Sequence, residues 1–301
     1  MAVAERRLAA GGPLRPRRAP GQIWLFFRRW PIIPALIIGI LTCFAIFAPL
    51  LANHDPKRGN LDFRTVPPSW AADGTSSHLL GTDPLGRDVW SRVVFGARIS
   101  LLVAAIVLTA GAVGGTSMGL VSGYLGGNTD ELMMRFVDMT FAVPFILVAL
   151  VAVIVFGQSL QMIVILLIVF SFGSFARQIR GETLSLKTRE YVAQAKIAGG
   201  SAPYIMWRHI LPGVFNTLMV IASLRVGSLI LAEAVLSYLG VGVPPPTPAW
   251  GAMVSEGRDY IGTAWWISFF PGLAIFLTVL AFNFLGDWLR DRLDPRLRQL
   301  A

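Results

Sequence analysis

Long apolar stretches alternate along the chain with short polar connections. A helix needs about 20 apolar residues to cross the roughly 30 Å hydrocarbon core of a bilayer. Stretches near that length occur at residues 31–52, 99–122, 136–156, 162–176, 213–236 and 264–285. The pattern predicts an all-α, polytopic membrane protein with six transmembrane helices. An even number of spans places both termini on the same side.

Composition and charge support this class and orient it. Hydrophobic residues make up 54% of the 301 residues and charged residues only 14%, which excludes an ordinary soluble domain. The 26 Lys and Arg residues gather mostly in segments 6–29, 177–208 and 290–298. Since basic residues favour the cytoplasmic side, we predict that both termini are cytoplasmic. The net charge of +9 then requires no nucleic acid, and membrane lipid headgroups are the expected neighbours of the basic tails.

The chain divides into four regions. Residues 1–30 form a polar, cytoplasmic N-terminal tail, and residues 31–98 form the first transmembrane helix and an extracytoplasmic loop. This loop is expected to have little regular structure before an amphipathic helix near residues 88–97. Residues 99–286 form the main transmembrane domain, and residues 287–301 form a cytoplasmic C-terminal tail.

A polar segment at residues 189–212, inside the main domain, predicts two short helices. Gly199 and Gly200 separate them, because glycine accepts the left-handed conformation that ends many helices. Ser201 is expected to cap the second helix with its side chain, and Pro203 falls in the first turn, where its missing N–H is harmless. The segment is interpreted either as a docking site for a partner or as an ordinary amphipathic loop.

The first of these two helices has an apolar stripe. Helical spacing places four residues on one face, and two polar residues point elsewhere. The stripe contains Tyr191, Val192, Ala195 and Ala198, and the polar residues are Gln194 and Lys196.

Two charged residues lie in the fifth predicted span. Arg225 is near its middle, where an arginine costs roughly 2.5–3.5 kcal/mol to insert. It is a candidate for the translocation pathway, although a structural role stays open. For Glu233 a structural pairing is favoured, with a polar group such as Asn283 or Asp138.

Glycines step through the second span at every fourth position, from Gly111 to Gly127. This spacing predicts a face against which another helix packs closely. The same run contains a GxSxG pattern around Ser117, but that chemistry needs a serine on a strand-to-helix elbow. An intramembrane serine hydrolase using Ser117 and His209 is the rival hypothesis, and the sequence places no orienting acid for it.

Other chemistry is not indicated. Cys43 is the single cysteine, and the three histidines show no metal-ligand spacing. We therefore predict no metal site and no cofactor. The chain has no GxxxxGKS/T sequence for binding nucleotide phosphates, so any energy from ATP must come from other subunits. No catalytic residue is expected.

Several segments resemble one family. Ala193-Gln194-Ala195, Gly199 and Leu211-Pro212 are spaced as in the EAA loop of bacterial ABC importer permeases. Residues 80–101 (LGTDPLGRDVWSRVVFGARISL) resemble the segment before the second span in permeases of the DppC/OppC type, which serve dipeptide, oligopeptide and nickel importers. Residues 233–251 resemble the end of their fifth span with the loop after it, and residues 283–297 resemble their C-terminal end. The resemblance covers nearly everything from residue 20 onward.

This resemblance implies an ABC type I importer transmembrane fold in the bacterial inner membrane. The chain would form half of a pathway for peptides, or alternatively for nickel or another small solute. Its partners would be a homologous DppB-like permease, two DppD/DppF-like ATPase subunits and a DppA-like extracytoplasmic binding protein. Tyr191 to Ile205 would be the coupling region. Ala193 replaces the consensus glutamate, so apolar packing by Tyr191, Ala195 and Ala198 is expected to carry the coupling.

Overall fold

The computed structural model describes residues 31–293, which contain α-helices and no β-strand. The predicted tail at 1–30 and the end of the predicted C-terminal tail, from 294 onward, lie outside the described residues. The α-helices are α2 Ile32–Leu51, α3 Val89–Leu125, α4 Gly127–Ala142, α5 Phe145–Phe156, α6 Leu160–Leu186, α7 Glu190–Ile197, α8 Ala202–Ile205, α9 Leu211–Tyr238, α10 Trp250–Gly257 and α11 Trp266–Leu293.

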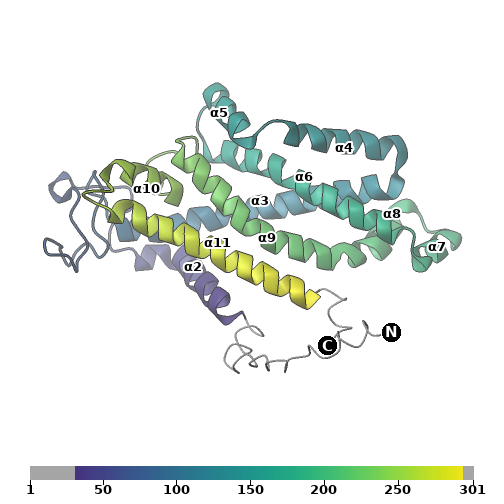
Figure 1. The fold of residues 1–301 in the computed structure, drawn as a ribbon, viewed down its shortest axis with the longest axis horizontal. Helices are drawn as coiled ribbons and strands as arrows, with labels where there is room; N and C mark the ends of the chain where they lie inside the picture. The colour runs from purple at the N-terminus through teal and green to yellow at the C-terminus, as the bar shows by residue number, and fades with distance from the viewer. Residues whose placement is uncertain (1–30, 294–301) are drawn as a thin grey trace, which may run out of the picture.

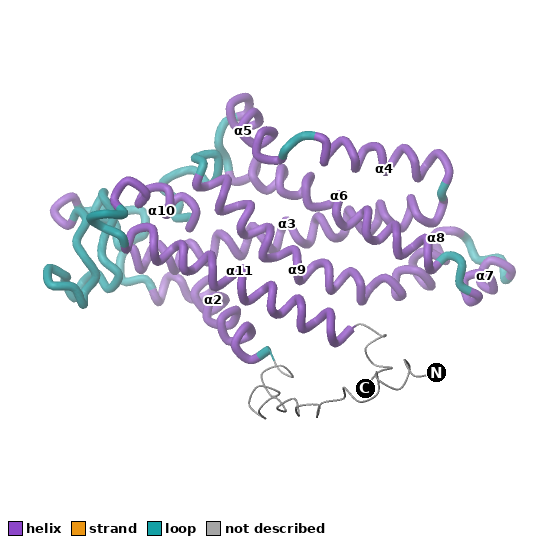
Figure 2. Tube along the Cα trace, in the orientation of Figure 1, coloured by secondary structure: helices purple, strands orange, loops and turns teal. Residues whose placement is uncertain are grey.

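The long helices run side by side along the length of the molecule (Figure 1). Within the described residues, five helical segments are long and apolar enough to cross a membrane, and the bent pair α4–α5 makes a sixth when its two helices are counted as one span. Most irregular backbone gathers at one end of the bundle, and α7 and α8 lie at the opposite end (Figure 2). The predicted six-span, all-α class is confirmed.

The third predicted span is broken. Val143 is extended, with φ −111° and ψ 134°, and the axes of α4 and α5 differ by 81°. Pro144 explains the break, because proline lacks an N–H and disfavours helical geometry in the residue before it. The 12 residues of α5 span only about 18 Å. The prediction of one continuous helix over 136–156 is therefore wrong.

Ion pairs hold α4 along α6. Arg180 donates to both carboxylate oxygens of Asp130, at 2.5 and 2.6 Å. Arg177 donates to Asp138 at 2.7 Å. This pairing uses Asp138, so the expected contact of Asp138 with Glu233 does not form.

The glycine steps of α3 form the predicted packing face, and it lies against α6. A Cβ at Gly115 would lie 2.4 Å from the backbone oxygen of Phe172, and one at Gly119 would lie 2.6 Å from that of Ala176. These distances are too short for any side chain larger than hydrogen. Gly127 begins α4 instead and does not take part in this face.

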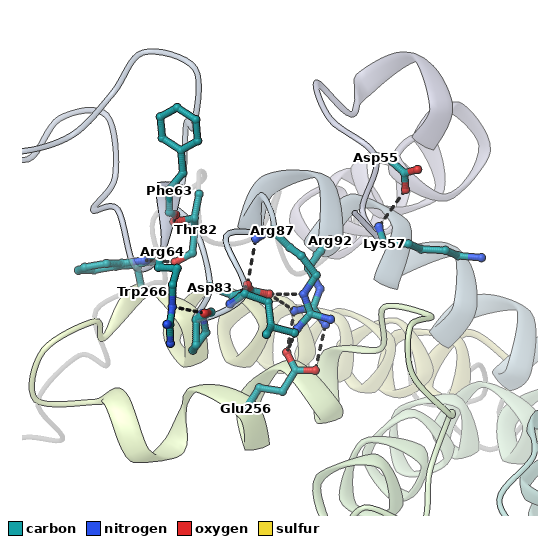
Figure 3. Close-up of polar contacts among 12 residues, drawn as sticks. Asp55, Lys57, Phe63, Arg64, Thr82, Asp83, Arg87, Arg92, Glu256 and Trp266 are labelled. Carbon is teal, nitrogen blue, oxygen red and sulfur yellow. Dashed lines mark hydrogen bonds and ion pairs between the residues drawn. The ribbon is translucent and has the colours of Figure 1, made fainter. Parts of the chain in front are cut away.

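A cluster of charged side chains ties the irregular end together (Figure 3). Arg87 and Arg92 both contact Asp83 and both donate to Glu256 in α10, at 2.8 and 2.6 Å. Asp83 is fully buried, and the two arginines together balance its charge and that of Glu256. The predicted helix near residues 88–97 forms the first turns of α3, which lie directly under this cluster.

Candidate functional site

The segment between α6 and α9 has the predicted helix-turn-helix form. Gly199 has φ +82°, and its N–H donates to Lys196 O at 3.0 Å. The N–H of Gly200 donates to Ala195 O, also at 3.0 Å. These two bonds define a Schellman motif, which satisfies the last carbonyls of α7. The predicted left-handed turn is thus confirmed.

The second short helix differs in one respect. Pro203 is in the first turn of α8, as expected, and Ser201 is its N-cap residue. The Ser201 side chain makes no capping hydrogen bond, and only its carbonyl accepts from Ile205 N, at 2.9 Å. The prediction of a side-chain cap is therefore wrong.

Three apolar residues anchor this segment to the bundle. Val192 in α7, Ile205 in α8 and Ile210 just before α9 are fully buried. They pack in one cluster with Phe175 and Ile179 of α6 and with residues of α3 and α9. The segment is therefore a packed part of the bundle's end.

The outward surface of the same segment is unusually apolar. Its large exposed side chains are Tyr191, Ile197, Tyr204 and Trp207, with Ile197 87% exposed. The predicted stripe divides, because Val192 faces the bundle whereas Tyr191 and Ala198 are exposed, together with Ala193 and Gln194. Large apolar side chains gathered on a surface mark an interaction site.

The segment continues directly into a bundle helix. Residues Met206–Ile210 form one π-helical stretch, η3, between α8 and α9. Residues Ala202–Tyr238 therefore form one continuous 37-residue helical segment. No non-helical residue separates α8 from α9.

A cavity of about 800 Å³ with a mixed polar and apolar lining lies along α9, between α6 and α11. Its polar and charged lining residues are Gln178, Glu182, Asn216, Thr217, Arg225, Ser228 and Arg290. Arg225 is 14 residues after the start of α9 and 13 before its end, so it lies about 20 Å from either end. Within residues 31–293, no ion pair is made by the side chains of Glu182, Arg225 or Arg290. The cavity thus presents charge without an ion-pair partner within the described residues, from the exposed Arg290 near the end of α11 to Arg225 at the middle of α9.

Glu233 has a structural role, with partners other than those expected. It is buried, accepts from Ser237 Oγ at 2.7 Å and accepts from Ser100 Oγ of α3 at 3.2 Å. The proposed pairing with Asn283 or Asp138 is wrong. Asn283 lies instead beside Gly227.

Ser117 and His209 do not form a catalytic pair. Ser117 is exposed on α3, and the ring of His209 stacks edge-on against Tyr204, with centroids 5.5 Å apart. In the described part of the chain no hydrogen bond joins them.

A bundle whose long helices are apolar enough to cross a membrane is the fold of a multi-pass membrane protein. Residues 115–299 match the family model described as "Binding-protein-dependent transport system inner membrane component". The chain therefore belongs to this family and is a multi-pass inner-membrane protein.

Similar proteins agree with this assignment. The chain is 38% identical to the dipeptide transport system permease protein DppC of Haemophilus influenzae, over 94% of this chain and 97% of that protein. It is 40% identical to the di/tripeptide permease DppC of Pseudomonas aeruginosa, over 88% of each. It is 42% identical to the glutathione permease GsiD of Escherichia coli, over 92% of this chain and 90% of the relative. The resemblance to DppC/OppC-type permeases is confirmed.

Proposed function

We propose that this chain is one of two permease subunits of an ABC importer for short peptides. The continuous helical segment Ala202–Tyr238 carries the proposal, because it joins the apolar docking surface to the helix that lines the cavity. Similarity to dipeptide, di/tripeptide and glutathione permeases supports a peptide substrate.

The docking surface is proposed to contact an ATPase subunit. Tyr191, Ile197, Tyr204 and Trp207 would enter a groove of that subunit, while Val192 and Ile205 keep the segment fixed to the bundle. This assignment places α7 and α8, and therefore both termini, in the cytoplasm. Closure of two ATPase subunits on ATP would then displace α8 and tilt α9.

The cavity is proposed to form this chain's half of the pathway, which a homologous second permease completes. Arg225 would donate a charge-assisted pair of hydrogen bonds to the terminal carboxylate of a peptide. A peptide also carries an amino terminus, for which Glu182 offers an opposite charge in the same cavity. An extracytoplasmic binding protein would deliver the peptide at the opposite end of the bundle.

The first experiment tests the docking assignment. The chain is tagged, and a photo-crosslinking residue replaces Ile197 in one version and Trp70 in the control. Trp70 is 60% exposed and lies in the irregular end. Illumination of native membranes followed by mass spectrometry should capture an ATPase from position 197 only. An ATPase captured from position 70, or from neither position, would refute the coupling assignment.

The second experiment tests the substrate. The complex that co-purifies with the tagged chain is reconstituted in proteoliposomes with its binding protein, and ATP-driven uptake is measured with dipeptides, glutathione and Ni²⁺. Uptake of peptide confirms the assignment. Uptake of Ni²⁺ alone would overturn the peptide substrate and leave the permease role intact.

A further inference from the structure

The fold brings together two histidines that lie 24 positions apart in the sequence. The rings of His54, just after α2, and His78, in the loop before α3, stack with centroids 4.6 Å apart. His78 Nδ1 lies 3.1 Å from Asp88 Oδ1. One ligand atom from each of the three side chains lies within 4.8 Å of the others.

We propose that His54, His78 and Asp88 bind a divalent first-row transition metal ion, most suitably Zn²⁺. Two imidazoles and a carboxylate are a set of ligands that zinc accepts, with a fourth position left for water. This site is separate from the cavity lined by Arg225 and does not depend on the peptide assignment.

The separations between the three ligand atoms suit a zinc site once the His54 side chain moves. Zinc–ligand bonds of about 2.0–2.2 Å in a tetrahedron separate neighbouring ligand atoms by roughly 3.3–3.5 Å. The His78–Asp88 pair is already close to that separation. His78 and Asp88 are 5% and 2% exposed, so their positions are fixed by packing. His54 is exposed, so its side chain has room to rotate toward the other two ligands when the ion binds.

Ser91 orients two of the three ligands. Its hydroxyl donates to Asp88 Oδ2 at 2.7 Å and accepts from the backbone N–H of His54 at 3.1 Å. The backbone N–H of Ser91 also donates to Asp88 Oδ2, at 2.8 Å. These bonds occupy Oδ2 and leave Oδ1 directed at His78. Outer partners of this kind fix the orientation of metal ligands.

There is room and favourable charge for the ion. A cavity of about 250 Å³ is lined by all three side chains. Arg58 also lines it, but its exposed guanidinium pairs with Asp55 at 3.5 Å. Zinc would take the place of the direct contact between His78 Nδ1 and Asp88 Oδ1. The bound ion would fasten the end of α2 to the start of α3.

The test compares zinc content in the intact transporter complex. The purified complex is stripped with a chelator, exposed to Zn²⁺, passed through a desalting column and analysed for metal. We expect His54→Ala to carry one zinc fewer per copy of this chain than the unaltered complex, and His209→Ala, the matched histidine control, to keep it. Equal zinc content in His54→Ala and the unaltered complex would overturn the proposal.

Two further variants keep the proposal testable if His54→Ala fails to fold. Asp88→Asn keeps a good helix-capping group and should lose the same equivalent of zinc. Ser91→Ala should bind zinc about 10–100-fold more weakly, as expected for loss of an outer partner. Co²⁺ substituted in the unaltered complex should show ligand-field absorption that His54→Ala lacks. Unchanged zinc affinity in both Asp88→Asn and Ser91→Ala, with both complexes intact by gel filtration, would also refute the site.

Discussion

Replacement of Arg225 by methionine should stabilise the protein and impair transport. An arginine at the middle of a membrane helix costs roughly 2.5–3.5 kcal/mol. Arg225 is partly exposed to the cavity, which offsets part of this cost, so we expect Arg225→Met to gain about 1–2 kcal/mol. A gain of this size raises Tm by a few degrees. Tryptophan fluorescence of the purified complex during heating measures it.

The expected loss of transport follows from the proposed carboxylate contact. A hydrogen bond to a charged group contributes about 1.5–3 kcal/mol, and 1.4 kcal/mol corresponds to a factor of ten. Uptake by Arg225→Met should therefore fall by about tenfold or more at low peptide concentration. Arg225→Lys keeps the charge but not the bidentate geometry. Its uptake should therefore lie between that of the unaltered transporter and that of Arg225→Met.

A modified substrate isolates the contact. A dipeptide with a C-terminal amide lacks the carboxylate, so the unaltered transporter should discriminate against it at saturating binding protein. Arg225→Met should transport the acid and the amide equally slowly. If Arg225→Met is more stable and transports dipeptide at the normal rate, Arg225 has no role in the pathway and the reasoning fails.

Three other variants test the remaining assignments. Gly199→Val, which forces a branched side chain into φ +82°, should let ATP hydrolysis continue while uptake falls. The control is Gly181→Ala, at a helical glycine with no atom near the added Cβ, and it should leave the ratio of uptake to ATP hydrolysis unchanged. Equal ratios in Gly199→Val and Gly181→Ala would contradict the proposed coupling role of the turn at Gly199. Gly119→Leu should destabilise the α3–α6 contact by about 1–3 kcal/mol or more, measured by Tm, whereas Gly114→Leu, in open space, should not. Ser117→Ala should leave uptake unchanged, and its loss with normal expression would revive the serine hydrolase hypothesis.

The broken third span illustrates a feature that the sequence signals locally but whose geometry depends on distant contacts. Pro144 follows an apolar, helix-compatible run, and proline before a second apolar run is a recognisable signal of a break. Hydropathy averaged over a window does not register the break, because the window 136–156 stays apolar overall although it contains Asp138, Thr140 and Pro144. Ion pairs between α4 and α6 hold the bent arrangement, and these pairs join residues about 40–50 positions apart.

The sequence by itself determined the features that depend on near neighbours. Apolar stretches of membrane length, the glycine steps of α3 and the left-handed turn at Gly199 all follow from local hydrophobicity and backbone sterics. The family could be recognised for the same reason, because its motifs are short and continuous.

Only the tertiary structure decided which distant polar groups meet. The partners of Glu233, the lining of the Arg225 cavity and the approach of His54 to His78 depend on how each helix is rotated and how the irregular end folds. A membrane helix that is apolar on every side carries little signal for its rotation. That rotation is set by the packing of backbones at glycine faces and by a few buried polar contacts, which form only when the whole bundle is assembled.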